Sequence, residues 1–343
     1  MIDTIKFFIS IEDESILTKI KNNFKRFRKD DLKTGHIEFE FFTGDFEMGT
    51  YHRKVGVKST NNPLGLFIEF SLPKYSKGNN VEMIHAYDLP KIMDQFYDEL
   101  CIHINYPLAH YSTWVIYKLD ICYNWTLEDQ QKVLYAMNFL RRIDFPRKKK
   151  YLYDTSVMHL GSSYVVKFYS KGPEFTKNDS KKISFDRSYA LQMFADKIVR
   201  FEVGLKRTYL ADQLLKDTVY VSDISDDELI LQMLNFFLKD KMFQYIKLDS
   251  MSNENIKETL MSNYSKTMAT RLYQFYKDFY FNEEIKHMLL SGGLNRSTIY
   301  RYKKCLQKVG IGISTDALPE TAHILKLLII PSPTSKFDLL DYK

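Results

Sequence analysis

The sequence of 343 residues is poor in the features that mark secreted and membrane proteins. Its three cysteines, Cys101, Cys122 and Cys305, lie far apart and form no C-x-x-C pair, so neither a disulfide framework nor a thiolate zinc site is favoured. The apolar run LKLLIIP near the C-terminus is far too short to span a bilayer, and acidic residues come too early for a signal peptide. We therefore expect a protein of a reducing cytoplasm that is neither secreted nor embedded in a membrane.

Proline is scarce as well, at 9 residues, and no low-complexity segment or internal repeat is visible, so we expect an ordered, globular protein. The hydrophobic fraction of 45% is enough to bury one large core or two smaller ones. The formal net charge of +6 is modest, but basic residues gather in residues 21–29, 141–150 and 296–304. Such clusters are suited to phosphate contacts, and a solvated face is the alternative.

Strand and helix patterns are mixed before about residue 215, and helical patterns dominate after it. Strand patterns cover residues 1–10, 36–44, 51–59, 64–72, 113–125 and 198–206, with a hairpin at 151–171, and helix patterns cover residues 13–27, 89–104, 127–142 and 187–197. These patterns predict an α+β fold, with a mainly antiparallel sheet and helices packed on one face, in residues 1–215. Residues 216–343 are predicted to form a mostly helical domain.

Four of the predicted strands carry a polar face that holds Glu69, Asp120, Tyr169 and Glu202 among lysines and arginines. In the strand at 113–125, Tyr117 is expected on the opposite, apolar side. If the strands share one sheet, three carboxylates would come close together and repel one another unless a divalent cation or neighbouring bases held them. Carboxylate oxygens favour Mg²⁺ or Mn²⁺, which would polarise a phosphate for attack by a tyrosine oxygen. The alternative is an ordinary polar sheet face, with acids paired to bases across strands.

The segment SGGLNRSTIYRYKKCLQKVGI predicts a short helix, a glycine turn and a second helix capped by Asn295 or Ser297. This order is similar to a helix-turn-helix, whose second helix enters the major groove of DNA. The residues expected to contact DNA are Arg296, Thr298 and Arg301 at the bases and Lys303 and Lys304 at phosphates. A surface helix with ordinary basic residues is the alternative.

Several segments, in the same order, resemble the gene II protein family of filamentous bacteriophages, the rolling-circle replication initiators, together with related phage and plasmid replication proteins. They are MIDTIKF, GLFIEFSLPK, KLDI, VVKFYSK, IVRFEVGLKRTYL and NRSTIYRYKKCLQKVGI, of which RFEVGLKRTYL is the most characteristic. The resemblance implies an initiator that nicks one strand of a duplex origin, becomes linked to the 5′ phosphate and frees a 3′ hydroxyl for a polymerase.

The resemblance also implies roles for individual residues. The active tyrosine falls on Tyr169, the acidic positions that would bind Mg²⁺ or Mn²⁺ fall on Glu69, Asp120 and Glu202, and Lys171 would stabilise phenolate or phosphate charge. Residues 1–215 would then form the nicking domain, and residues 216–343 a DNA-binding or accessory domain. The partners would be origin DNA and, in a bacterial host, a helicase and a polymerase.

One departure from many rolling-circle initiators is the lack of a His-hydrophobic-His motif, since His103 is followed by Ile104 and Asn105. The metal would be held by carboxylates alone, or a histidine such as His159 would contribute. Tyr189 and Tyr209 are second-choice nucleophiles. Two other functions stay open: a non-catalytic, sequence-specific origin-binding or regulatory protein, and a strand transferase of the relaxase or transposase type.

Overall fold

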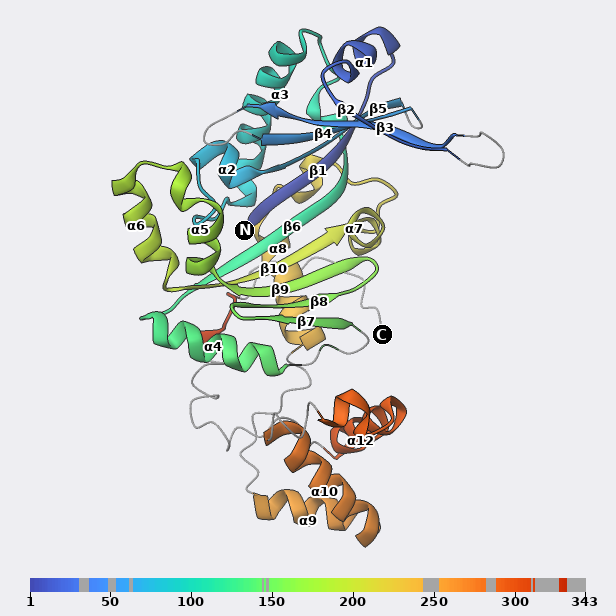
Figure 1. Cartoon of the computed structure of the whole chain (residues 1–343), viewed down its shortest axis with the longest axis vertical. Helices are drawn as coiled ribbons and strands as arrows, with labels where there is room; N and C mark the ends of the chain where they lie inside the picture. The colour runs from blue at the N-terminus through green and yellow to red at the C-terminus, as the bar shows by residue number, and fades with distance from the viewer. Residues whose placement is uncertain are drawn as a thin grey trace. The chain divides into compact units, whose positions relative to one another are not determined.

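The computed structural model describes residues 1–30, 37–48, 54–61, 64–143, 145, 148–242, 253–281, 288–309, 311 and 327–331. The chain divides into two compact units, one of Met1–Phe237 with the segment that starts at Ile330, and one of Leu238–Ile329. The first unit is built on an antiparallel sheet with helices, and the second is helical (Figure 1). The predicted fold class is therefore confirmed.

In the described part of the chain, ten strands form one sheet in the order β2-β3-β4-β5-β1-β6-β10-β9-β8-β7. Their bounds are β1 Ile2–Ser10, β2 Lys25–Asp30, β3 Ile37–Glu47, β4 Lys54–Asn61, β5 Leu64–Ser71, β6 Val115–Thr126, β7 Lys149–Tyr153, β8 Ser156–Leu160, β9 Tyr164–Ser170 and β10 Ile198–Lys206. The strands that carry the predicted site residues are β5, β6, β10 and β9. Because β1 pairs with both β5 and β6, these strands and β1 lie side by side in the middle of the sheet.

Helices cover the apolar face of this sheet. On α3 (Leu89–Ile104), the Phe96 ring lies 5.8 Å from Phe7 and stacks at 4.3 Å on Phe70. Helix α4 (Gln130–Arg142) packs along β8, β9 and β10. The apolar residues that alternate along these strands, such as Phe168 and Phe201, are fully buried. The polar residues of the same strands therefore project from the other face.

The helix predicted for residues 13–27 is wrong in its second half. Helix α1 (Glu14–Lys21) ends before Asn22, and Lys25–Asp30 forms strand β2, which pairs with β3. The spacing of the apolar residues also suits a helix, but β3 offers backbone hydrogen bonds along the whole segment and sets Phe27 directly opposite Phe41.

A β-bulge overturns a second expectation, that Tyr117 lies on the apolar face. Lys6 pairs with Lys118, whereas the next residue, Phe7, pairs with Ile116, so Tyr117 is an extra residue in β6. Ile116 takes the buried position instead, and the Tyr117 ring packs edge-on against Phe67 at 4.7 Å.

The predicted division at residue 215 falls inside the first unit, between α7 (Arg207–Leu214) and α8 (Asp227–Asn235). Both helices pack on the sheet, α7 against β6 and β10 and α8 against β6, so the contacts separate the units only after Phe237. A helical pattern in the sequence does not reveal which core a helix joins.

In the second unit, α9 (Asn253–Asn263), α10 (Lys266–Phe281) and α12 (Arg296–Lys308) share a core of their own. The buried members of that core include Leu260, Leu272, Phe275, Tyr276, Ile299 and Leu306. Across the described residues, no helix is both long and apolar enough to cross a membrane. The remaining α-helices of the first unit are α2 (Leu72–Lys77), α5 (Lys171–Asn178) and α6 (Phe185–Ala195).

Candidate functional site

The strand pairings bring the four predicted side chains onto one face of the sheet, which we call the polar face. Across β5, β1 and β6, Glu69 lies opposite Lys6, and Lys6 lies opposite Lys118. Glu202 on β10 lies opposite Lys167 on β9. Residues paired in this way in an antiparallel sheet project from the same face, so the acids form a row that alternates with lysines.

Lysines link two of the three acids. The Lys118 ammonium lies 3.0 Å from Glu69 Oε1 and 2.9 Å from Asp120 Oδ2, and Lys6 lies 3.3 Å from Glu69 Oε2. Burial by itself would raise the pKa of Glu69, but Lys118 and Lys6 lower it below its usual value. Neighbouring bases, one of the two alternatives left open by the sequence, therefore hold Glu69 in this structure.

Asp120 is the least satisfied of the acids. Its side chain is buried, with 4% of the residue exposed, and among the described residues no group donates a hydrogen bond to its Oδ1. Burial and the charge of Glu202 raise the pKa of Asp120 to about 6. Gly204 lies opposite Asp120 on β10, and a Cβ at Gly204 would come within 2.7 Å of Oδ1. Glycine at position 204 therefore leaves room for this carboxylate.

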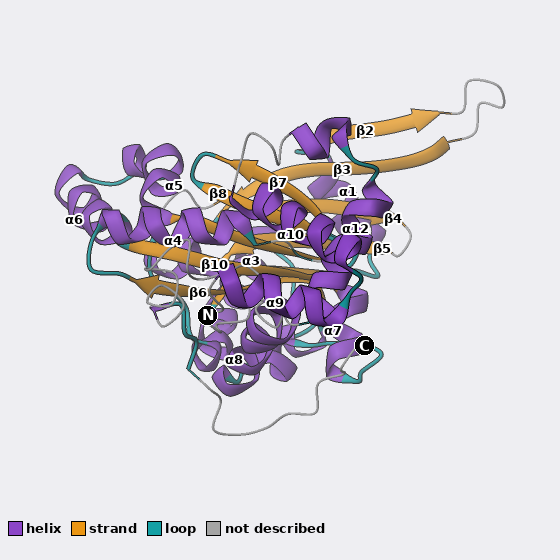
Figure 2. Ribbon diagram, turned by 90° about the horizontal axis from the view of Figure 1, so that it is seen from below, coloured by secondary structure: helices purple, strands orange, loops and turns teal. Residues whose placement is uncertain are grey.

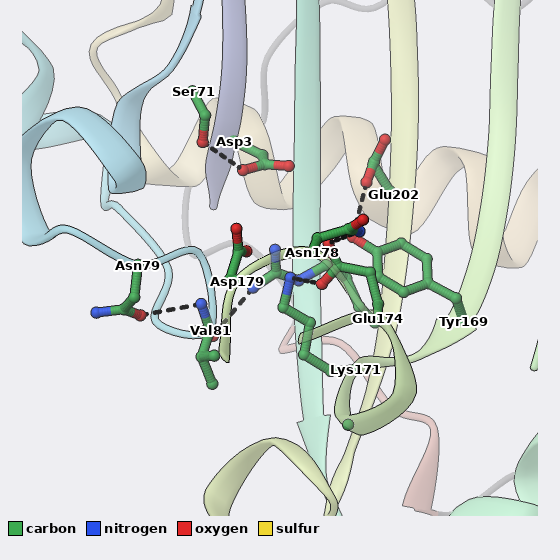
Figure 3. Close-up of polar contacts among 12 residues, drawn as sticks. Asp3, Ser71, Asn79, Val81, Tyr169, Lys171, Glu174, Asn178, Asp179 and Glu202 are labelled. Atoms are coloured by element: carbon green, nitrogen blue, oxygen red, sulfur yellow. Dashed lines mark hydrogen bonds and ion pairs between the residues drawn. The ribbon is translucent and has the colours of Figure 1, made fainter. Parts of the chain in front are cut away.

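Glu202 joins Tyr169 and Lys167 through its two oxygens. The Tyr169 hydroxyl donates to Glu202 Oε2 at 3.0 Å (Figure 3). The Lys167 ammonium donates to Glu202 Oε1 at 2.5 Å. Burial would raise the pKa of Glu202, but Lys167 lowers it, so the carboxylate is ionised at neutral pH. Tyr169 is half-buried, and burial together with the Glu202 charge raises its pKa well above the usual value.

Lys171 does not continue the strand face. Strand β9 ends at Ser170, and Lys171 is the first residue of α5, where its side chain is fully buried and paired with Glu174 at 2.5 Å. Its ammonium lies 5.7 Å from the centre of the Tyr169 ring. Burial and the nearby Arg200 lower the pKa of Lys171 to about 8.

Arg200 is a site residue to which the sequence assigned no role. It lies opposite Tyr169 on β10, is fully buried, and donates to Asn124 Oδ1 at 2.7 Å and to the Val81 carbonyl at 3.0 Å. Within the described ranges, its Nη1 has no hydrogen-bond partner. The sequence feature that could have identified Arg200 is its position two residues before Glu202, on the same face of the predicted strand.

Asp3 is a second residue that the sequence did not single out. Alternation along β1 would point it to the apolar core, but a bulge between Ile2 and Thr4 makes Asp3 the extra residue of the strand. Its carboxylate accepts a hydrogen bond from Ser71 at 3.3 Å, is almost fully buried, and acts electrostatically on both Tyr169 and Arg200 (Figure 3). The sequence feature that could have identified Asp3 is a charged residue among the apolar residues at the beginning of a predicted strand.

Of the three predicted metal ligands, only Asp120 has, among the described residues, a carboxylate oxygen without a hydrogen-bond partner. Asp120 and Glu202 interact strongly enough to raise the pKa of Asp120, and the Oδ1 atom that no described residue satisfies is available as an oxygen ligand. Glu69 has both oxygens paired with lysines, and Glu202 has one oxygen bonded to Lys167 and the other to Tyr169. Over the residues that the structure describes, no group of three or more His, Cys, Asp or Glu side chains is arranged to hold a metal.

The other candidate residues lie away from the polar face. His159 pairs with Val166 on the apolar side of the sheet and is fully buried beside the Phe145 ring. Tyr209 is buried in α7 against Tyr164, at 4.8 Å between ring centres. Tyr189 lies on α6, where it is 63% exposed.

The residues predicted to contact DNA all belong to α12. Asn295 immediately precedes this helix, and its side-chain oxygen accepts a hydrogen bond from the Ser297 backbone amide. Arg301 and Lys304 are exposed, Thr298 is half-buried, and the Lys303 ammonium lies 4.3 Å above the Phe279 ring of α10. The side chain of Arg296 lies outside the described residues. Their contact with DNA stays a prediction.

A family profile that describes the N-terminal part of the gene II replication-associated protein matches residues 1–225. The chain belongs to this family, which confirms its resemblance to the gene II rolling-circle replication initiators. Among curated proteins, none matches the sequence. A solved structure similar to the chain is titled "Structure of Rolling Circle Replication Initiator Protein from Geobacillus stearothermophilus"; it shares 12% identity, with 68% of this chain and 83% of that chain covered and a TM-score of 0.30.

Membership in this family makes the chain a replication initiator, and origin DNA is the partner that this role implies. The family match covers all the described strands of the sheet and therefore every residue of the polar face named above.

Replacement of Asp120 by asparagine is expected to change how stability depends on pH. In the folded protein the pKa of Asp120 is raised to about 6, so this group favours folding below about pH 4, and the benefit is lost as the pH rises through 6. Asparagine does not ionise, so the variant escapes this loss. The change in unfolding free energy caused by Asp120→Asn should therefore be roughly 1–3 kcal/mol more favourable at pH 8 than at pH 4. Urea unfolding in EDTA at both pH values measures this difference.

Glu69→Gln is the matched control, because the folded-state pKa of Glu69 is lowered rather than raised. Its stabilising effect is present above the usual glutamate pKa and is lost on acidification, so Glu69→Gln should lose stability at pH 8 relative to pH 4. If Asp120→Asn changed the unfolding free energy by the same amount at pH 4 and pH 8, the pKa of the Asp120 carboxylate would not be raised in the folded protein, contrary to the prediction.

Proposed function

We propose that this initiator is a metal-dependent endonuclease that nicks origin DNA at one site and rejoins it through a 5′-phosphotyrosine intermediate. The observation that carries the proposal is the 3.0 Å hydrogen bond from the Tyr169 hydroxyl to Glu202, on the polar face beside Asp120, whose Oδ1 no described residue satisfies. In the proposal, Tyr169 is the nucleophile, Glu202 accepts its proton and Asp120 is a cation ligand.

Tyr169 needs a base because its pKa is raised well above the usual value, so the neutral phenol dominates at physiological pH. Glu202 is ionised and already accepts the phenolic hydrogen bond. In the proposed step the proton passes to Glu202 as the tyrosine oxygen bonds to phosphorus, and the bond from phosphorus to the 3′ oxygen breaks. The 3′ oxygen takes a proton from solvent and becomes the hydroxyl that primes synthesis. Rejoining reverses these steps.

The residues that would hold Mg²⁺ or Mn²⁺ are Asp120 and Glu202. A bound cation would polarise the scissile phosphate. In the proposal, Lys118 leaves the two carboxylates and pairs with a DNA phosphate. This exchange releases Glu69 Oε1 and Asp120 Oδ2, so that Glu69 becomes a third ligand of the cation. The same exchange supplies a positive charge to the incoming backbone.

Two positively charged residues near Tyr169 support its proposed role as the nucleophile. Arg200 lies opposite Tyr169 in the sheet, and Lys171 lies 5.7 Å from the ring centre. Both cations lower the cost of negative charge on the phenolic oxygen as its proton leaves. Because Lys171 is paired with Glu174 and buried, it acts on the ring through the electrostatic field rather than through contact with the phosphate.

Origin recognition is assigned in this proposal to α12, through Arg296, Thr298 and Arg301 at the bases and Lys303 and Lys304 at phosphates. A host helicase and polymerase would then act on the nicked origin. The second candidate, a non-catalytic origin-binding protein, is favoured by the pairing of Lys118 with both Glu69 and Asp120, as in an ordinary polar sheet face. It predicts salt-sensitive origin binding that survives EDTA, with no nicking under any metal.

Tyr169→Phe should abolish covalent attachment to DNA, since it removes the attacking oxygen and changes little else. We expect wild-type protein with Mg²⁺ to nick supercoiled origin plasmid and to retain, through denaturing electrophoresis, radiolabel from the strand on the 3′ side of the cut, whose 5′ phosphate is joined to the tyrosine. The variant should lose nicking and label by at least about a thousandfold, the usual scale for loss of a nucleophile.

Tyr189→Phe is the control, because Tyr189 is exposed on α6 and should leave both signals unchanged. Full nicking by Tyr169→Phe would refute the assignment of the nucleophile. Attachment in neither protein, with origin binding intact, would favour the non-catalytic alternative.

Cation binding should appear as thermal stabilisation without any DNA. Mg²⁺ or Mn²⁺ at about a hundred times its dissociation constant should add about 2.7 kcal/mol to the unfolding free energy of wild-type protein, a shift of a few degrees. Asp120→Asn and Glu202→Gln should lose the shift. Glu69→Gln should keep most of it while Lys118 remains paired, and a shift that survives Asp120→Asn would contradict the proposed ligands.

Nicking should slow as the pH rises through 8. The pKa of Lys171 is lowered to about 8, so its positive charge falls about tenfold between pH 7 and pH 9. Lys171→Arg keeps the charge and should move the decline to higher pH. Single-turnover adduct formation from pH 6.5 to pH 9.5 measures both profiles, with thermal unfolding of the variant as the check on folding; a flat wild-type profile would contradict a role for the Lys171 charge.

A further inference from the structure

The polar face does not end at Glu69. Two residues before it on β5, Phe67 pairs with Lys58 on β4, and Lys58 pairs with Thr43 on β3. Thr43 in turn pairs with Lys25 on β2. Each pairing keeps the same face, so the surface that carries the candidate site continues to the far edge of the sheet. Figure 2 shows β2 and β3 extending beyond the neighbouring strands at that edge.

Aromatic rings and lysines alternate along this part of the face. Phe27 on β2 is 47% exposed and stacks on Phe41 with their ring centres 5.3 Å apart and their planes 13° from parallel. The Lys58 ammonium lies 3.8 Å from the centre of the Phe41 ring, and Lys25 is exposed beside Phe27. A stacked pair of rings, one exposed and one half-buried, with an ammonium group over the second ring is an unusual use of apolar surface on a strand.

A second aromatic group connects these rings to the acids. Phe67 packs against Phe8 at 5.1 Å and against Tyr117 at 4.7 Å between ring centres. Lys6, which pairs with Glu69, lies 5.8 Å from the centre of the Phe67 ring. The bulge in β6 that turns Tyr117 out of the core is what completes this group.

We propose that the surface formed by Lys25, Phe27, Phe41, Lys58 and Phe67, which we call the arm track, binds single-stranded DNA adjacent to the nick. This inference rests on the proposed nicking function. Ring faces stack on unpaired bases without regard to sequence, and lysines beside them follow the backbone. Bases of a duplex are already stacked on one another and offer no face to Phe27.

The other face of β2 is built differently, which argues against a general basic arm. Arg26 donates to Glu40 at 2.6 Å, so its charge is already neutralised. The arm track instead includes Lys25, an exposed residue two positions before Phe27 on the same face of β2. The two faces of one short strand therefore differ in the ligand that each suits.

The length of the track sets the size of the ligand. The strand order places β2 five strand spacings from β6, which carries Asp120. At about 4.8 Å per spacing this is about 24 Å, a distance that several nucleotides of single-stranded DNA span. That falls within the roughly 4–16 nucleotides of known single-strand-binding surfaces.

The test is fluorescence anisotropy of the full chain in EDTA, with a labelled oligothymidylate of about 16 nucleotides and a duplex of the same length as probes. Phe27→Ala should weaken binding of oligothymidylate about tenfold and binding of the duplex less than twofold, and Phe27→Trp should restore it. Unchanged affinity for oligothymidylate would overturn the proposal. An equal loss for both probes would overturn it too, because the arm would then bind duplex DNA.

Lys25 and Arg26 form a charge-matched pair on opposite faces of β2. Lys25→Ala should weaken binding of oligothymidylate severalfold, and Arg26→Ala should change it less than twofold; equal effects would overturn the proposal by reducing it to net charge. Covalent attachment by wild-type protein separates the two hypotheses. If wild-type protein attaches to DNA but Phe27→Ala leaves the affinity for oligothymidylate unchanged, only the arm-track proposal is refuted. If Phe27→Ala weakens that affinity but wild-type protein forms no covalent attachment, only the nicking proposal is refuted.

Discussion

The arrangement of the site depends on one buried carboxylate, that of Glu202. It projects from β10, in the middle of the sheet, and divides its two oxygens between the Lys167 ammonium and the Tyr169 hydroxyl. A buried glutamate without partners would take up a proton, so Lys167 is what keeps this carboxylate ionised and able to accept a proton from the tyrosine. The same charge raises the pKa of Asp120 on the neighbouring strand. The proposed nucleophile, base and cation ligand are thus electrostatically coupled.

This coupling produces electrostatic stress that nearby lysines relieve in part. Lys118 joins Glu69 to Asp120, but Asp120 keeps an oxygen that no described residue satisfies. A structure selected for stability alone would not bury such an atom, since an unsatisfied buried acceptor costs about 1–3 kcal/mol. The cost is consistent with the proposal that this surface binds a cation and a DNA backbone.

Strand alternation was sufficient to predict the faces of Glu69, Glu202 and Tyr169, because regular antiparallel pairing preserves them. It failed where β1 and β6 bulge, since one extra residue reverses the side on which Asp3 and Tyr117 project. It also could not tell that Lys171 begins a helix, or that residues 25–30 pair with β3 rather than extend α1. The metal, the nucleophile and the DNA contacts of α12 stay predictions, because partner chemistry is not encoded in periodicity.

The most direct test of the account is to identify the amino acid that carries the DNA. Wild-type protein would be reacted with origin DNA in Mg²⁺, digested with nuclease and trypsin, and analysed by tandem mass spectrometry for a peptide that bears a residual 5′ nucleotide. The account predicts that the nucleotide is attached to Tyr169, in the peptide that ends at Lys171. Attachment to any other tyrosine, such as Tyr117 on the same face, would contradict the pairing of Tyr169 with Glu202 as the source of the activity.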